Sequence, residues 1–356
     1  MSVVFTRLPD LPEGVKNGVA AENSHTLYAG LGSAGKRFFF LELDNLEKGW
    51  QRAPDFPGVE RSDAVCIADN KGIWVFSGAG VPENSDYAQV LEDVYCFDFA
   101  GQKWSKIDTL TPVGLLGGSG SKIAEDQFVF FGGYNKQTFD KFCQKMSQID
   151  VDKHPEQRQI LLSEFMSQKP EAYGWNKDII LYNTEQNHWQ FLQENPFSAN
   201  CGSAVITDGN KVTLVDGEIK PGLRSTEVKQ FTFQSTKDVV CKLLPSISCD
   251  SDLPEHEGLA GAFSGQIDGH CFAMGGAYFV GSQRNLRDGE WYTHQGLTKH
   301  YSNDVWRLDD SWEKVAQLPE GAAYGSVVTT DEGLILIGGE ESQQKALVSC
   351  YLMKWI

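Results

Sequence analysis

Short apolar runs that end in glycine recur along the chain. Each run is too short for a core helix and rich in aromatic or β-branched residues, so each is predicted to be a buried strand. The terminal glycine lets the chain turn where a side chain would clash. The six runs are Leu27–Gly32, Ile73–Gly78, Phe128–Gly133, Val212–Gly217, Cys271–Gly276 and Leu334–Gly339. A repeat of roughly 50 residues is typical of a propeller or a solenoid.

Other strand-like segments flank each run. A stretch of small residues such as Ser62–Ala68 precedes it, as expected of strands crowded around a central axis. A third strand follows, as in Asp93–Asp98 or Asp178–Asn183. A fourth begins with tryptophan, at Trp50, Trp104, Trp189 and Trp312. Four strands in each of six repeats predict an all-β fold, a six-bladed β-propeller.

The sixth repeat has no fourth strand of its own. The chain ends soon after its third strand, Leu347–Lys354, whereas Phe5–Pro12 resembles the ends of the other repeats. We therefore expect Val3–Leu8 to complete the last blade and close the ring, which removes the open sheet edges. Residues 1–356 are then one domain, although length alone suggests two or three.

Three insertions interrupt the repeat after the glycine turns of blades three to five: Tyr134–Lys177, Glu218–Thr226 and Ala277–Ser302. These turns share one face of a propeller, so the insertions should gather over one mouth of its channel, where functional sites usually lie. The first contains Gln157–Gln168, whose apolar stripe predicts a helix packed on the propeller rim. Direct contact of this helix with a substrate is the alternative.

The second insertion carries a carboxylate, Glu218, where other blades have Gly, Tyr or Ala. Arg224 follows six residues later, after a Pro-Gly turn that can fold the loop back. A base beside a fixed cation suits chemistry on an acidic sugar, and a rim ion pair without chemistry is the alternative. Glu340 stands similarly after the last turn, and a purely structural role is open for it.

The third insertion combines aromatic side chains with guanidinium groups, which suits a carboxylated, polyhydroxylated ligand. These residues are Arg284, Asn285, Arg287, Trp291, Tyr292, His294, His300 and Tyr301. Two histidines at this spacing are a weak indication of a metal, and no cluster supports zinc, iron or copper.

The amino-acid composition excludes some classes of binding partner and indicates a cellular compartment. Thirty-one Lys and Arg against 48 Asp and Glu give a net charge of −17, which disfavours nucleic acid and anionic membranes. The eight cysteines are dispersed without CxxC, which favours buried free thiols in a reducing compartment. The N-terminus lacks the pattern of a secretory signal. We therefore expect a cytoplasmic protein that acts on a small molecule; a homodimer is left open.

The repeats resemble kelch repeats in their paired glycines, the Tyr-Cys-Phe-Asp segment of blade two and the late tryptophan. The segments GEIKPGLRS (Gly217–Ser225), GSQRN (Gly281–Asn285) with HQGL (His294–Leu297), and GLGSAG (Gly30–Gly35) resemble the bacterial N-acetylneuraminate epimerase family, the sialic acid mutarotases. The resemblance covers nearly the whole chain. It implies interconversion of the α- and β-anomers of N-acetylneuraminate, without metal or organic cofactor.

The resemblance also implies residue roles. The family's proposed proton acceptor falls on Glu218, its substrate-binding arginines on Arg224 and Arg284, and another motif arginine on Arg61. These four residues are expected to converge on one mouth of the channel. Asn285 is expected to help Arg284 hold the sugar.

The general acid is open between Tyr292, His294 and a water molecule, and His294 is also a candidate substrate contact. One departure concerns the family's Gly-Arg-Ala-Tyr-Gly pattern, which here has Ala322 in place of the arginine. A channel arginine is therefore expected to be missing. Family members are typically exported, which makes a periplasmic location the alternative.

Two other functions remain open from the sequence. A kelch interaction module would bind a sugar or protein without turnover and would need an exposed apolar patch. A lyase or hydrolase for acidic sugars would need the same cationic clamp with a second acid or base.

Overall fold

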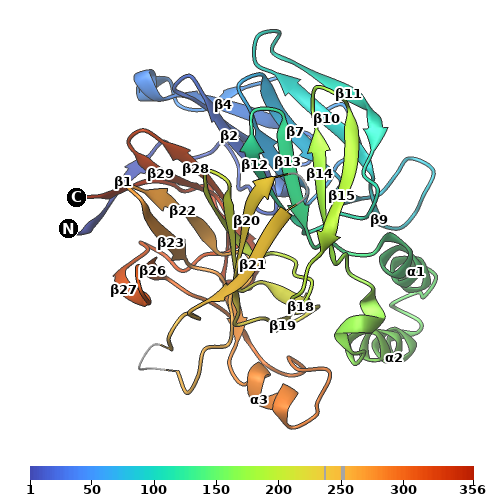
Figure 1. Ribbon diagram of the computed structural model, residues 1–356. Helices are drawn as coiled ribbons and strands as arrows, with labels where there is room; N and C mark the ends of the chain where they lie inside the picture. The colour runs from blue at the N-terminus through green and yellow to red at the C-terminus, as the bar shows by residue number, and fades with distance from the viewer. Residues whose placement is uncertain (236–237, 250–252) are drawn as a thin grey trace.

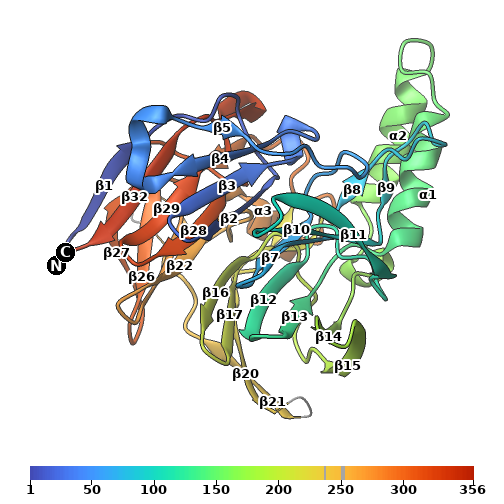
Figure 2. The same cartoon turned by 90° about the horizontal axis from the view of Figure 1, so that it is seen from above.

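The computed structural model describes residues 1–235, 238–249 and 253–356. Six four-stranded antiparallel sheets surround a central axis as the blades of a propeller (Figures 1 and 2). This confirms the predicted fold class. In every blade the small-residue strand lies innermost, and the apolar run is the buried second strand.

The strands of the blades, from the axis outward, are as follows. Blade one has β2 (Val19–Asn23), β3 (Thr26–Gly30), β4 (Phe38–Glu42) and β5 (Gln51–Arg52). Blade two has β6 (Val65–Ala68), β7 (Gly72–Phe76), β10 (Asp93–Asp98) and β11 (Lys103–Leu110). Blade three has β12 (Ser119–Ala124), β13 (Gln127–Phe131), β14 (Asp178–Asn183) and β15 (His188–Glu194).

Blade four has β16 (Ala204–Asp208), β17 (Lys211–Val215), β20 (Val228–Ser235) and β21 (Asp238–Leu244). Blade five has β22 (Phe263–Ile267), β23 (His270–Met274), β26 (Asp304–Leu308) and β27 (Trp312–Gln317). Blade six has β28 (Ser326–Thr330), β29 (Gly333–Ile337), β32 (Cys350–Trp355) and β1 (Val3–Leu8).

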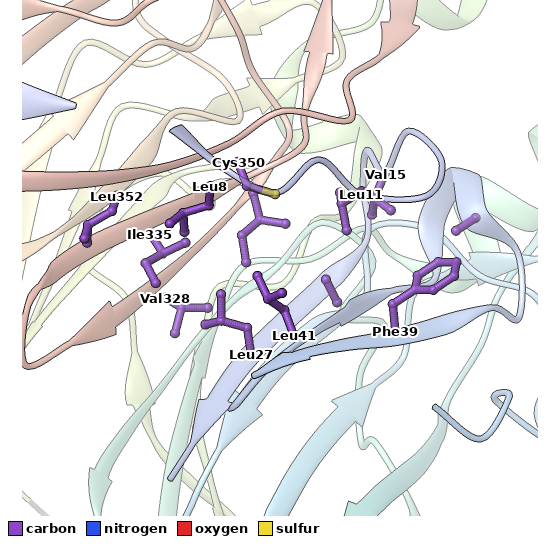
Figure 3. Close-up of a cluster of buried hydrophobic side chains, with 13 residues drawn as sticks. Leu8, Leu11, Val15, Leu27, Phe39, Leu41, Val328, Ile335, Cys350 and Leu352 are labelled. Atoms are coloured by element: carbon purple, nitrogen blue, oxygen red, sulfur yellow. The ribbon is translucent and has the colours of Figure 1, made fainter. Parts of the chain in front are cut away.

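The N-terminal strand closes the ring, as predicted. β1 pairs antiparallel with β32, from Val3 opposite Trp355 to Leu8 opposite Cys350. The two chain ends therefore lie side by side (Figure 1). An apolar cluster that includes Leu8, Leu27 and Ile335 fills the seam between blades six and one (Figure 3).

The connections after the second strands form short ribbons and helices. The ribbons are β8 (Ala79–Gly80) with β9 (Gln89–Val90), β18 (Glu218–Lys220) with β19 (Leu223–Arg224), β24 (Ala277–Phe279) with β25 (Lys299–Tyr301), and β30 (Glu340–Glu341) with β31 (Lys345–Ala346). The α-helices are α1 (Lys136–Ser147), α2 (Pro155–Met166) and α3 (Ser282–Arg287). These connections also contain the 3₁₀ turns Gly32–Ala34, Pro170–Tyr173 and Ser342–Gln344, and a further 3₁₀ turn, Leu43–Lys48, joins the third and fourth strands of blade one. The three helices and the β18–β19 ribbon lie on one side of the propeller (Figure 1), where the insertions were expected to gather.

The first insertion contains two helices rather than the one predicted. The predicted helix begins two residues earlier, at Pro155, and α1 precedes it. Phe165 of α2 stacks on Phe142 of α1, with ring centroids 3.8 Å apart. Ile160 of the predicted stripe is instead 58% exposed. Phe165 also packs in one cluster with Tyr173, Trp175 and Cys201, so the helix contacts the propeller rim, as predicted, as well as α1. Helix α1 itself meets the rim where Asp140 accepts a hydrogen bond from the Val90 amide.

Six equivalent residues form a ring of backbone hydrogen bonds around the axis. Each N–H donates to the carbonyl of its counterpart in the preceding blade, over 2.7–3.0 Å. All six have φ between 52° and 67°, a left-handed conformation that favours glycine. The members of this axial ring are Asn17, Asp63, Gly117, Gly202, Gly261 and Tyr324.

The axial ring separates the channel from the insertions. On one side the innermost strands of all six blades line a cavity of about 320 Å³. On the other side the residues just before the ring pair with the starts of the insertions, as Cys201 pairs with Glu218 and Ala323 with Glu340. The ring is therefore the floor of the mouth on which the insertions converge.

Candidate active site

The β18–β19 ribbon places Glu218 directly opposite Arg224. Oε1 of Glu218 lies 3.3 Å from Nη2 of Arg224 and 3.3 Å from the backbone nitrogen of Gly222, which donates to it. Gly222 has φ +81°, and a Cβ atom there would overlap the ring of His294. The Pro-Gly turn thus folds the loop back, and glycine is required for the close approach.

Arg224 is a buried cation with a fixed orientation. Its side chain is only 2% exposed. Nε donates to the Ala277 carbonyl over 3.2 Å, Nη2 lies 3.4 Å from the Tyr324 hydroxyl, and the guanidinium stacks 4.6 Å from the Phe279 ring centroid. Nη1 has no hydrogen-bond partner among the described residues. The protein therefore leaves one buried guanidinium nitrogen unsatisfied, and an anion that reached it would form a charge-assisted hydrogen bond.

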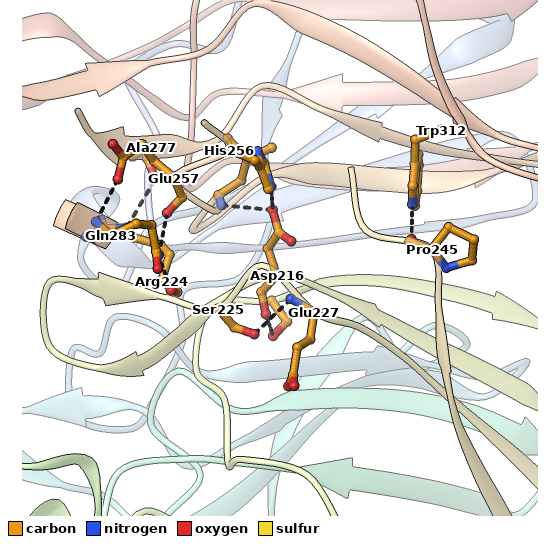
Figure 4. A network of polar contacts seen from close by, with 12 residues as sticks. Asp216, Arg224, Ser225, Glu227, Pro245, His256, Glu257, Ala277, Gln283 and Trp312 are labelled. Atoms are coloured by element: carbon orange, nitrogen blue, oxygen red, sulfur yellow. Dashed lines mark hydrogen bonds and ion pairs between the residues drawn. The ribbon is translucent and has the colours of Figure 1, made fainter. Parts of the chain in front are cut away.

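The third insertion contacts Arg224 through Gln283 (Figure 4). Gln283 of α3 donates to the Arg224 carbonyl over 2.8 Å. Buried Glu257 accepts from the Ser282 hydroxyl and the Gln283 amide, each over 2.9 Å, and from the Gly281 amide. The start of α3 is thereby fixed against the backbone of Arg224.

Glu340 occupies the matching position in blade six, but there the negative charge of the carboxylate is balanced by two lysines. Its carboxylate accepts from Lys16 and Lys299 Nζ, over 2.5 and 2.6 Å, and from the Tyr301 hydroxyl over 2.5 Å. Burial raises the pKa of Glu340, but these three donors outweigh it and hold the pKa below its usual range. Lys299 also lies 4.5 Å from the ring centroid of Tyr324. This carboxylate is therefore a fixed anion that positions two lysines at the mouth.

Two members of the axial ring add side chains to the mouth. The Tyr324 hydroxyl reaches Arg224, as described above, and burial raises its pKa so that it stays protonated. Burial also raises the pKa of Asp63 to about 6, opposed by a hydrogen bond with Ser62 and reinforced by the charges of Glu218 and Glu340. Asp63 can therefore hold a proton near neutral pH.

His294 is kept neutral. Burial, with the charges of Arg224 and Lys220, lowers its pKa to about 4. Its ring stacks on Phe279 with centroids 4.9 Å apart, and its Nδ1 is buried without a hydrogen-bond partner in the described structure. Tyr292 meets the same ring edge-on at 5.0 Å. His294 therefore borders Phe279, the aromatic support of Arg224, and Tyr292 packs against His294.

A second buried cation joins the insertions. Lys220 is 0% exposed, and its Nζ donates to the carbonyls of Met166 and Gln168 over 2.6 and 2.7 Å, and to that of Trp291. Burial lowers its pKa to about 8. One side chain of the second insertion therefore binds both the first and the third.

Two of the predicted binding residues lie outside this cluster. Arg284 is exposed on α3, where its charge acts on Glu255. Asn285 donates to the Thr293 carbonyl over 2.8 Å and so holds the third insertion together. In this structure neither contacts Glu218 or Arg224.

The structure does not bring Arg61 to the mouth. Its side chain is fully buried, with Nη1 2.9 Å from Asp93 and 3.0 Å from the Ser77 carbonyl. The guanidinium stacks on Phe56 at 4.8 Å. Arg61 stands two residues before its ring member, a position that points between the blades.

The same position in blade six is Ala322. Its carbonyl accepts from Gly276 of the preceding blade, just as that of Arg61 accepts from Gly32. Ala322 is 4% exposed and packs in an apolar cluster with Phe263. The expectation that its replacement removes a channel arginine is therefore corrected, because this position faces the space between blades.

Sequence reasoning did not select Lys16, Asp63, Tyr324, Lys299 or Lys220. A signal existed for two of them. Asp63 and Tyr324 align with glycines in three other blades, so a side chain at this position departs from the repeat. The lysines had no such signal, because their partners come from distant blades or insertions.

Among the residues that the structure describes, no group of three His, Cys, Asp or Glu side chains is placed to hold a metal ion. None of the helices in the described ranges is long and apolar enough to cross a bilayer.

Fold and site together define a six-bladed propeller whose mouth carries a carboxylate and a fixed guanidinium, an arrangement for acid–base chemistry on an anionic ligand. The chain belongs to the N-acetylneuraminate epimerase family, whose sequence model matches residues 8–356. It is 41% identical over 349 residues to an N-acetylneuraminate epimerase of Vibrio cholerae, covering 98% of this chain and 90% of that protein.

Other known proteins are similar to this chain over nearly its whole length. An N-acetylneuraminate epimerase of Brucella melitensis is 40% identical, over 98% of this chain and 90% of that protein. A kelch domain-containing protein of Vibrio cholerae is 42% identical over 98% of both chains. The solved structure of YjhT superimposes with a TM-score of 0.89 at 29% identity, covering 98% of this chain and 97% of that one.

Proposed function

We propose that this protein interconverts the α- and β-anomers of N-acetylneuraminate by acid–base opening and closure of the sugar ring. The observation that carries the proposal is the Glu218 carboxylate held beside the buried guanidinium of Arg224, at the channel mouth of a member of this family. Both groups are fixed by the same ribbon, so their relative geometry does not depend on the substrate.

The reaction requires a proton to leave the anomeric hydroxyl while another reaches the ring oxygen. Glu218 is the base that takes the hydroxyl proton. The bond between the anomeric carbon and the ring oxygen then breaks and a ketone forms. After rotation the ring oxygen attacks the opposite face of the ketone, and the protons return. Positioned acid–base groups contribute about 10²–10⁴-fold, which suits a reaction that already proceeds slowly in water.

Arg224 selects and orients the sugar. In N-acetylneuraminate the carboxylate is bonded to the anomeric carbon itself. A carboxylate that accepts from the free Nη1 of Arg224 therefore brings the anomeric hydroxyl next to Glu218, whose Oε1 lies 3.3 Å from the neighbouring Nη2. Holding reacting groups in place in this way lowers the entropic part of the barrier.

The surrounding residues take supporting roles in this proposal. His294 and Phe279 form an aromatic wall beside Arg224, against which apolar parts of the sugar can pack. Arg284 is exposed on the insertion next to Arg224 and would contact the outer part of the sugar. Asn285 and Arg61 take structural roles in this proposal, because Asn285 donates to the Thr293 carbonyl and Nη1 of Arg61 pairs with Asp93.

Proton NMR of freshly released α-N-acetylneuraminate tests the proposal. Addition of the protein should speed the approach to the anomeric equilibrium without changing the final ratio of anomers. The same spectra test the other functions. A lyase would produce new resonances from the free sugar, a hydrolase would do so only when a sialoside is added as substrate, and a binding module would broaden signals without faster exchange. An equilibration rate equal to that of buffer alone would overturn the proposal.

A further inference from the structure

Three carboxylates surround the mouth, and they differ in how their charge is balanced. Glu340 accepts from two lysines and a tyrosine, as described above. Glu218 has Arg224 and the Gly222 amide. Asp63 makes no ion pair within the described ranges, and its side chain has a hydrogen bond with Ser62. Of the three, Asp63 is therefore the one that can exchange a proton without breaking an ion pair.

The axial ring places Asp63 at the centre of the mouth. Its amide donates to the Asn17 carbonyl over 3.0 Å, and its carbonyl accepts from Gly117 over 2.9 Å. Its φ of +54° is a conformation that costs a residue with a Cβ atom about 1–2 kcal/mol. Glycine, which three other blades use here, would avoid this strain. An unpaired carboxyl in a strained position is typical of functional sites.

One side chain of the ring contacts Arg224 directly. Tyr324, from the same ring, brings its hydroxyl to 3.4 Å from Arg224. The groups close enough to interact electrostatically with Asp63 come from five blades. They are Lys16, Ser62, Tyr134, Cys201, Glu218 and Glu340.

From this arrangement we propose that Asp63 is the second catalytic residue, which exchanges the proton of the ring oxygen while Glu218 exchanges that of the anomeric hydroxyl. The inference rests on the proposed function. In ring opening, protonated Asp63 gives its proton to the ring oxygen as the bond to the anomeric carbon breaks, and Glu218 accepts the hydroxyl proton. In closure both transfers reverse on the other face, so the enzyme gains and loses no proton.

The alternative acids at the mouth are less suited. His294, with a pKa of about 4, carries almost no proton at neutral pH. Tyr134 and Tyr324 have raised pKa values and so release their protons less readily. The pKa of Asp63, about 6, lies near the pH of the reaction, where general catalysis is most effective. A bound substrate carboxylate would raise it further, since a second negative charge disfavours ionisation.

Asp63→Asn tests the role, because asparagine adopts the same conformation at Asn17 of the same ring. We expect kcat for anomer exchange to fall about 10²-fold with KM within about threefold. Asp63→Gly, which copies Gly117, should lose activity similarly. Glu60→Gln is the matched control, because it removes a negative charge from the same loop at an exposed side chain and should leave exchange unchanged.

The pH profile distinguishes chemistry from structure. The kcat/KM of the native protein should decline as the pH rises above about 6, and in Asp63→Asn this decline should disappear. A native profile that is flat between pH 5 and 8 would overturn the role of Asp63, even if neither variant folds. So would native-like exchange in Asp63→Asn, while the proposed function would stand. A native protein that fails to speed exchange would overturn both.

Discussion

The carboxylate of Glu218 faces the guanidinium of Arg224 across a two-stranded ribbon, with 3.3 Å between Oε1 and Nη2. They are six positions apart in the sequence, and the Pro-Gly turn makes them cross-strand partners. Arg224 is almost fully buried, whereas the Glu218 side chain is 19% exposed. The cation is therefore fixed by the protein, and the carboxylate remains accessible to a substrate.

Glu218→Gln removes the proposed base while keeping the shape of the side chain. Anomer exchange should fall by about 10²-fold or more, because the amide cannot accept a proton at neutral pH. Binding of N-acetylneuraminate should persist, since Arg224 is untouched. Saturation-transfer NMR measures exchange and binding in one sample. Exchange at the native rate in this variant would assign the base to another residue.

Arg224→Lys keeps the charge but loses the planar fork. A lysine cannot donate to Ala277 and Tyr324 while leaving a second nitrogen for the substrate. Loss of a charge-assisted hydrogen bond costs about 1.5–3 kcal/mol, so KM should rise about 10–100-fold. Steady-state kinetics measure the change. Arg287→Lys is the control, because its pair with Glu255 is exposed and outside the site.

Most of the fold could be predicted from the sequence, because each repeat is marked by short segments that lie close together along the chain. Strand runs, glycine turns and the position of β1 all follow from spacing that each blade repeats. Helix α1 was missed although a signal for it exists: Phe139, Phe142, Cys143 and Met146 follow the i, i+3, i+4, i+7 spacing of a helical stripe. The Glu218–Arg224 pair could also be predicted from local sequence, because both residues lie in one short loop with a turn between them.

The rest of the site depends on contacts that sequence spacing does not encode. Arg61 and Arg224 both match arginines of the family, but one points between blades and the other into the mouth. Asp63 and Tyr324 reach the mouth only because the axial ring brings six distant segments together. The ring is a property of the closed propeller, so it appears only when all blades are in place.

Lys220→Met should loosen the insertions. The substitution leaves three carbonyl acceptors, from Met166, Gln168 and Trp291, without their charged donor. Unsatisfied buried polar groups should lower the free energy of unfolding by about 2–4 kcal/mol. Denaturant unfolding measures the loss, and limited proteolysis should cut the first insertion more readily. Lys177→Met, which breaks an exposed pair with Glu194, should change stability by less than about 1 kcal/mol. An equal effect of the two substitutions would contradict the role of Lys220.

The lowered pKa of His294 makes stability depend on pH. Because the folded pKa, about 4, lies below the unfolded value of 6.5, the unfolded state binds more protons between these limits. The contribution of His294 is therefore present above pH 6.5 and lost as the pH falls through 4. Asp63 acts in the opposite direction, since its raised pKa gives a contribution that is lost as the pH rises through about 6.

Comparing His294→Phe with the native protein separates the contribution of His294 to the pH dependence of stability from that of Asp63, which is present in both proteins. The loss of stability between pH 7 and pH 5 should be about 1 kcal/mol smaller in the variant than in the native protein, after allowance for partial exposure of the ring. Urea unfolding at the two pH values gives the difference. An identical pH dependence in the two proteins would show that the imidazole titrates normally.

Gly222→Ala should disrupt the site through a single methyl group. The added Cβ atom would lie 1.8 Å from Nδ1 of His294, and the residue has φ +81°. Either the imidazole or the ribbon must shift, and both movements displace Glu218 from Arg224. We expect kcat/KM to fall about 10²-fold, since misplacing catalytic groups by about 1 Å has effects of this size.

Gly209→Ala is the control, because Gly209 has φ +57° in the same blade but nothing within 4 Å of the added atom. It carries the same kind of backbone strain, so it should lower stability slightly and leave exchange at the native rate. Equal losses of activity in both variants would attribute the effect to backbone strain rather than to the contact with His294.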